Sequence, residues 1–193
     1  MWVRRSAIRP VPRYARVPAS AVAAAHALSS GSDEHARAFA RGGFGRLSVE
    51  QPALARYLQG RLSPSLDAAA LELGQRLAAA VYVAFESTPG LRLRGVGADA
   101  VAAADVALGA DEELRRADPM DALDSEDIVA IEQPALVAFV NEHIGLTLER
   151  NAGAIDVDHV ALVFRALLVE ILVLSHAVLS PPGHPAADAE PMA

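Results

Sequence analysis

Apolar residues recur at helical spacing along most of the chain, and one apolar segment dominates the pattern. Residues 158–180 contain no Gly or Pro, are rich in Leu, and end before Pro181 and Pro182. Such a segment predicts a long helix, because proline stops the helix that precedes it. Apolar residues occupy nearly the whole circumference of this helix, which is typical of a helix buried in a bundle. Arg165 and Glu170 interrupt the segment, so we expect a buried soluble helix and no membrane span.

The centre of this helix is the predicted core or self-association surface. Its most apolar stretch contains Leu167, Leu168, Ile171 and Leu172. The amount of apolar helix surface in a chain of 193 residues is more than its tails can cover. The pattern therefore favours association with a protein partner, most simply another copy of the same chain.

A repeated segment precedes two of the predicted helices. Residues 49–62 read VEQPALARYLQGRL, and residues 131–144 read IEQPALVAFVNEHI. Both copies have helical apolar spacing, and the proline suits the first turn of a helix. A predicted helix at 66–86 follows the first copy, and the helix at 158–180 follows the second. We interpret EQPAL as a helix-start device used twice; the alternative is a recognition motif used twice.

The fold class that this pattern predicts is all-α. We expect a helical bundle built from two related helix pairs with a pseudo-two-fold repeat, the halves covering about 47–86 and 129–179. The bundle domain occupies 33–180. A basic, Pro- and Ala-rich arm that is partly disordered precedes it at 1–32, and a disordered tail follows at 181–193.

The repeat also predicts two structural charge pairs. When the helix at 66–86 is aligned in sequence with the helix at 158–180, Arg76 matches Arg165. A buried guanidinium needs a carboxylate partner, and each repeat offers one just before its proline. We therefore expect Glu50 to pair with Arg76, and Glu132 to pair with Arg165.

Shorter helices are predicted at 19–29 and 33–41 and a longer one at 98–117, with a break near its Gly109. The glycines of the segment 42–45 (GGFG) should end the second helix and form a flexible joint. The acidic segment 118–127 does not have the EF-hand spacing, so we expect a solvated loop there.

The charge distribution separates the arm from the body of the chain. Every one of the 17 basic residues is Arg, and residues 1–32 carry five of them with no acidic residue. The remaining 12 Arg face 24 acidic residues, a balance of −12. The body should repel nucleic acid, so only the arm is a candidate for binding it or an acidic partner. The candidate residues of the arm are Arg4, Arg5, Arg9, Arg13 and Arg16.

Other interpretations of the arm stay open. An Arg-rich, acid-poor start resembles an organelle transit peptide. A basic arm can also lie on an acidic surface of its own protein, or it can be a solvated tail. Trp2 and Tyr14 favour docking, because disordered segments contain few aromatic residues.

Candidate chemistry is sparse. The chain has no Cys, which excludes disulfides, zinc–thiolate sites and thiol nucleophiles. No catalytic motif is present, so we expect neither enzyme activity nor a cofactor. Asp156, Asp158 and His159 form the one carboxylate–histidine cluster with helical spacing, which makes them candidate metal ligands, with His176 as a further one. In the simpler interpretation, Asp156 caps the helix and Asp158 complements its dipole.

These observations favour a cytoplasmic, non-enzymatic helical interaction or scaffold protein that self-associates. The alternative is a small metal- or ligand-binding bundle, since a cavity between helices would be its natural ligand site. A third possibility is a regulator whose Arg-rich arm contacts nucleic acid or an acidic partner.

Overall fold

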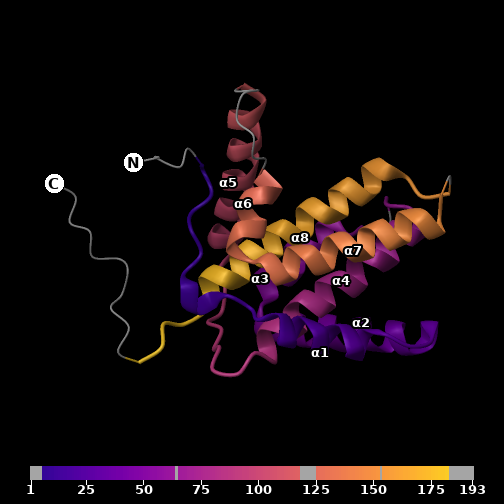
Figure 1. Cartoon of the computed structure of the whole chain (residues 1–193), viewed down its shortest axis with the longest axis horizontal. Coiled ribbons are helices and arrows are strands. Elements are labelled where there is room, and N and C mark those ends of the chain that lie inside the picture. Colours follow the sequence, from indigo (N-terminus) through magenta and orange to yellow (C-terminus); the bar gives the residue numbers. More distant parts are fainter. Residues whose placement is uncertain (1–5, 64, 118–124, 153, 183–193) are drawn as a thin grey trace.

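The computed structural model describes residues 6–63, 65–117, 125–152 and 154–182 (Figure 1). The described residues are mostly helical and form no strand, which confirms the predicted all-α fold class. The helices are α1 (Ala19–Ser29), α2 (Asp33–Glu50), α3 (Pro52–Arg61), α4 (Ala68–Glu86), α5 (Ala98–Ala117), α6 (Ser125–Glu132), α7 (Pro134–Arg150) and α8 (Val157–Ala177), with a short 3₁₀ turn before them at Arg13–Ala15.

Helices α4 and α8 pack against each other at the centre of the bundle and run in the same direction. Asp67, the N-cap of α4, accepts a hydrogen bond of 3.1 Å from the backbone N–H of Asp156, the N-cap of α8. Two turns further on, a Cβ added to Gly74 would lie 3.2 Å from the methyl groups of Val163. Glycine at this position therefore allows the two helices to approach closely.

The apolar centre of α8 belongs to the core of the single chain. Leu167, Leu168, Ile171 and Leu172 are each at most 4% exposed. They are covered by the chain's own helices, because α8 packs against α3, α4, α5, α6 and α7. The sequence pattern was compatible with either a core or an interface position for these four residues, and they lie in the core.

Helix α2 does not end at the glycines of the segment 42–45, so the predicted flexible joint is wrong. A Cβ on Gly43 would lie 2.8 Å from the Cβ of Ala79, and further along Arg46 pairs with Glu86 at 3.0 Å. The contacts advance along both helices together, so α2 and α4 are parallel. Gly43 is a contact point between helices, and the packing of α2 on α4 offsets the low helix propensity of glycine. The break expected near Gly109 is also absent from α5.

The two EQPAL segments form helix junctions with the same local geometry. Gln51, between α2 and α3, has φ −131° and ψ 60°, and Gln133, between α6 and α7, has φ −132° and ψ 63°. The amide of each side chain pairs with the backbone of an extended segment, 94–96 for Gln51 and 15–17 for Gln133. EQPAL therefore acts as a junction that holds a neighbouring strand-like segment. The wider pseudo-two-fold repeat stays a prediction.

The described part of the arm is packed against the bundle, and the expected partial disorder of the whole arm stays a prediction. Residues 6–17 cross the molecule beside α5 and α6 (Figure 1). Four of their apolar side chains are at most 5% exposed: Ile8, Val11, Ala15 and Val17. Arg4 and Arg5 lie outside the described residues, as do 118–124 of the predicted acidic loop and 183–193 of the predicted tail.

Two helices, α4 and α8, are long and apolar enough to cross a membrane. Within the fold, 67% of the most apolar window of α4 and 72% of that of α8 are buried. Core helices of soluble proteins share these properties, so the expected absence of a membrane span stays a prediction.

Candidate functional site: a cavity beneath the arm

Asp111 on α5 fixes the start of the arm. Its side chain is fully buried and accepts hydrogen bonds from Ser6 Oγ at 2.7 Å and from the backbone N–H of Ala7 at 3.0 Å. Arg115 Nε, at 2.7 Å, and Ser125 Oγ, at 2.8 Å, complete the set of donors. Burial alone would raise the pKa of this carboxyl, but hydrogen bonds from Arg115, Ser6 and Ser125 hold that pKa below its ordinary value. The ionised carboxylate thus ties the arm to α5 and α6.

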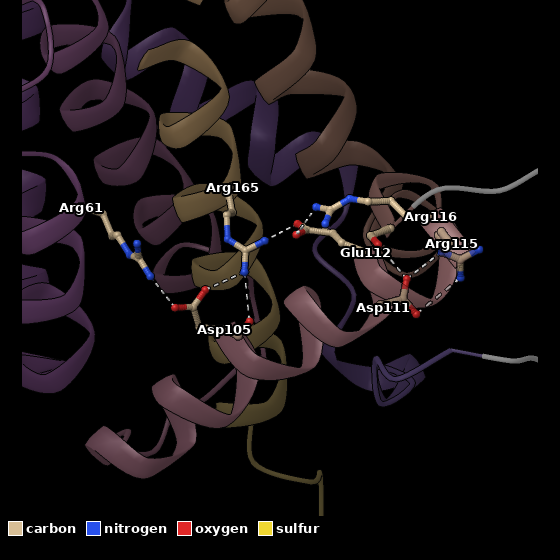
Figure 2. Close-up of polar contacts among 8 residues, drawn as sticks. Arg61, Asp105, Asp111, Glu112, Arg115, Arg116 and Arg165 are labelled. Carbon is tan, nitrogen blue, oxygen red and sulfur yellow. Dashed lines mark hydrogen bonds and ion pairs between the residues drawn. The ribbon is translucent and has the colours of Figure 1, made fainter. Parts of the chain in front are cut away.

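A second group of charges ties α5 to α3 and α8 (Figure 2). Arg165 on α8 donates to Asp105 Oδ1 at 3.0 Å and also contacts Glu112. Arg61 on α3 donates to the other oxygen of Asp105 at 2.7 Å. Burial tends to raise the pKa of Asp105, but the two guanidinium groups lower it overall. This network fixes α5 against α8, and so sets the width of the space between α5, α8 and the arm.

The two charge pairs expected from the repeat do not form. Glu132 lies 3.6 Å from Arg16 of the arm, while Arg165 is taken by α5. Glu50 accepts a hydrogen bond of 2.7 Å from Tyr82 Oη. The Nε atom of Arg76 is buried and has no hydrogen-bond partner among the described residues. The Glu132–Arg165 prediction was wrong because α5 and the arm, which supply the actual partners, have no counterpart in the repeat. The Glu50–Arg76 prediction was wrong because Tyr82 of α4 takes the Glu50 carboxylate.

The candidate metal ligands serve the start of α8. Asp156 accepts a hydrogen bond of 2.9 Å from the N–H of Asp158, as an N-cap does, and Asp158 lies in the first turn. His159 Nδ1 lies 3.2 Å from Asp67 Oδ2, at the start of α4. The described part of the chain contains no group of three or more His, Cys, Asp or Glu side chains that is able to hold a metal ion. The geometry matches capping, not coordination.

A cavity of about 540 Å³ lies between the arm, segment 94–97, α5 and α8. We call it the arm cavity. Its walls are apolar and made of small side chains, which leave the space open: Ala100, Ala103, Ala104 and Ala107 of α5, with Leu172 and Val173 of α8. Ala7 and Ile8 of the arm also line it. The hydrogen bonds from Ser6 and Ala7 to Asp111 hold this arm wall in place.

The polar side chains that line the arm cavity are basic. They are Arg9 of the arm, Arg94 of segment 94–97, and His176 near the end of α8. No carboxylate is among the lining residues. A guanidinium nitrogen of Arg94 donates to the backbone carbonyl of His176 at 3.3 Å. Burial lowers the pKa of the His176 imidazole, and the charges of Arg9 and Arg94 lower it further. The imidazole also hydrogen-bonds to the backbone of Arg9, and this bond and the charge of Glu132 act in the opposite direction without outweighing the lowering.

The sequence indicated part of this site. Arg9 and His176 were candidate residues, and both line the arm cavity. Arg16 pairs with Glu132 instead, and Arg13 lies in the 3₁₀ turn. Arg94 and Asp111 were not predicted from the sequence. The alanines on one face of residues 98–107 were the available signal, because a row of small side chains leaves space beside a helix.

Comparisons with known proteins returned no relative: the chain matches no protein-family model, no curated protein and no solved structure.

Proposed function

We propose that this protein is a non-enzymatic helical protein that binds a small organic carboxylate with a compact apolar body in the arm cavity. One observation carries the proposal. The chain has a net charge of −7, yet the cavity is lined by two guanidinium groups and an imidazole with no acidic residue. Such a lining attracts an anion.

The chemistry of the lining defines the ligand class. A guanidinium group presents paired N–H donors that match the two oxygens of a carboxylate. The alanines of α5 and the side chains of Leu172 and Val173 offer an apolar surface to the rest of the ligand. The volume of about 540 Å³ falls in the ordinary range of small-molecule sites, roughly 300–1,000 Å³.

The same lining favours binding over catalysis. It includes no Ser, Thr, Cys, Asp or Glu side chain, so it offers no hydroxyl, thiol or carboxylate nucleophile. This supports the non-enzymatic class that the absence of catalytic motifs predicts.

Calorimetric titration with 2-naphthoate tests the proposal. We expect saturable binding at one site per chain, and much weaker binding of the neutral analogue 2-naphthamide. Arg94→Gln should weaken 2-naphthoate binding by about tenfold or more, the worth of a charge-assisted hydrogen bond. Arg92→Gln is the matched control, because Arg92 carries the same charge two residues earlier and does not line the arm cavity.

A second variant addresses the cavity itself. Gly95 lines it, and a Cβ there meets no atom within 4 Å. Gly95→Leu should therefore occupy the space and abolish binding without loss of stability. Equal affinity for the acid and the amide, or equal weakening by Arg92→Gln and Arg94→Gln, would refute the proposal.

The structure weakens the argument for a scaffold function that the apolar pattern of the sequence suggested. That argument assumed that the apolar surface of α8 needs a partner to cover it, whereas the other helices of the same chain cover it. Self-association stays a prediction, and a native mass spectrum of the purified protein tests it by counting subunits. The arm is likewise engaged, since Arg16 contacts Glu132 and Ser6 contacts Asp111. This favours the interpretation in which the arm lies on an acidic surface of its own protein.

A further inference from the structure

A second cavity lies between α2 and α4, and it shares no lining residue with the arm cavity. We call it the α2–α4 groove; its volume is about 640 Å³. It follows α2 from Ala36 to Ser48, a length of about 18 Å at the rise of an α-helix. Apolar side chains form much of its lining: Ala36, Ala40, Phe44, Leu62, Ala68 and Leu71.

The register of the two helices places like charges across this groove. Arg37 of α2 pairs with Glu72 of α4, the Nε and Oε1 atoms being 3.4 Å apart. Because the helices are parallel, the next turn of each brings Arg41 opposite Arg76. Both arginines line the groove.

This pair of arginines lacks a counterion. Neither Arg41 nor Arg76 forms an ion pair with any carboxylate of the described chain, and the Nε of Arg76 is buried without a hydrogen-bond partner there. Glu72 is the one acidic residue of the lining, and it contacts Arg37. Two guanidinium groups beside an apolar surface are complementary to an anion with an apolar tail.

The occupant must also be slim. The side chains of Arg37 and Glu72 are both more than half exposed and meet across the groove, so they span its surface at one end. An α-helix with its side chains is about 10–12 Å wide, which is too wide to pass beneath this ion pair. A single acyl chain is narrow enough.

We propose that the α2–α4 groove binds a long-chain fatty acid. The carboxylate lies between Arg41 and Arg76, and the acyl chain lies on the apolar lining that continues from these arginines past Phe44 and Gly45. This site is separate from the arm cavity and does not depend on the function proposed for it.

Calorimetric titration of the purified full chain with dodecanoate tests the inference. We expect saturable binding at one site per chain. Dodecyltrimethylammonium, which has the same tail and the opposite charge, should bind at least tenfold more weakly. The double variant Arg41→Gln/Arg76→Gln should weaken dodecanoate binding by at least tenfold and remove the preference for the anion.

A plug in the groove gives an independent test that leaves both arginines in place. Gly45 lines the groove and Gly42 does not, and a Cβ at either position meets no atom within 4 Å. Leucine is the better helix former, so both substitutions should keep the protein folded. Gly45→Leu should abolish dodecanoate binding, whereas Gly42→Leu should leave it unchanged.

Three results would overturn the inference: no saturable binding of dodecanoate, equal binding of the cationic amphiphile, or full binding by Gly45→Leu. Arg94→Gln separates the two proposals. It changes the arm cavity alone, so loss of dodecanoate binding in that variant would assign the fatty acid to the arm cavity and refute the groove as its site.

Discussion

Glu170 is a carboxyl group in the middle of the core. It is fully buried on α8, and neither of its oxygens has a hydrogen-bond partner among the described residues. It lies seven residues after Val163 and so faces α4 as Val163 does. Desolvation raises its pKa well above the ordinary value for glutamate. The folded protein therefore holds Glu170 in its neutral, protonated form at pH values where the unfolded chain ionises it.

The sign of the resulting pH dependence follows from linkage. A group whose pKa is raised by folding stabilises the folded state most below its unfolded pKa. That contribution is lost as the pH rises toward the folded pKa. Glu170 thus makes the protein progressively less stable above about pH 4.3, the ordinary glutamate value.

Replacing Glu170 with Met should stabilise the protein, and more so at high pH. Methionine has a similar size and no polar atom to desolvate, so we expect a gain of about 1–3 kcal/mol in unfolding free energy at pH 8. The gain should be smaller at pH 5, and urea unfolding at the two pH values measures both. Glu170→Gln is the control, because it removes the titration but keeps a buried polar group. A gain that is the same at both pH values would show that Glu170 is already ionised in the folded protein.

Among the elements, α2 and α4 show how a single glycine sets the distance between two helices. At Gly43 an added methyl group would overlap Ala79, whereas at the neighbouring Gly42 it would meet open space. The two positions therefore differ in environment while sharing a helix and a residue type.

Alanine substitutions at these two glycines should have opposite effects on stability. Gly43→Ala should destabilise the protein by about 1–3 kcal/mol, because the backbones of α2 and α4 must move apart. Gly42→Ala should stabilise it by about 0.5–1 kcal/mol through helix propensity alone. Thermal or urea unfolding of both variants measures the difference. If Gly43→Ala were as stable as Gly42→Ala, the close contact between α2 and α4 would be disproved.

Local signals predicted the elements well and their partners poorly. The helix at Ala19–Ser29, the long α8 and the two EQPAL junctions were visible because proline, apolar spacing and capping act within a few residues. The role of Gly43 depends on Ala79, on another helix. That contact exists only after the helices have packed, so in the sequence alone the glycines of segment 42–45 suggested a flexible joint.

The site was harder to predict than the fold for the same reason. The sequence marked Arg9 and His176 as candidates but gave no cause to place them together with Arg94. Arg165 was paired with the wrong acid because its true partners, Asp105 and Glu112, lie on α5 outside the repeat. In each case the partner lies on an element whose position is set by tertiary packing.

For the molecule as a whole, Asp111 is the attachment point between the arm and the bundle. Its lowered pKa has the opposite consequence to that of Glu170. A carboxyl group whose pKa is depressed by folding contributes stability above its unfolded pKa, and this contribution is lost as the pH falls through the folded pKa. The two groups together predict greatest stability at mildly acidic pH.

Asp111→Asn should destabilise the protein by about 3 kcal/mol at pH 7, because Arg115 loses a buried ionic partner. The difference from the unsubstituted protein should shrink as the pH approaches 3. Hydrogen exchange in residues 6–17 should rise, since Ser6 and Ala7 lose a charged acceptor. Asp99→Asn on the exposed first turn of α5 removes the same charge and serves as the control. Unchanged exchange in the arm would mean that Asp111 does not hold it.

The attachment of the arm also fixes the order in which the molecule is completed during synthesis. Residues 6–17 leave the ribosome well before their partners, because Asp111 lies 105 residues after Ser6 and Gln133 lies 116 residues after Val17. Gln133 in turn donates to Ser175, which lies 42 residues further along the chain. Contacts of such long sequence separation form slowly, because a large loop must close before they contribute. The arm must therefore remain undocked until Asp111 and Gln133 have been synthesised. The arm cavity, which also needs His176, comes into existence only after nearly the whole described chain has emerged.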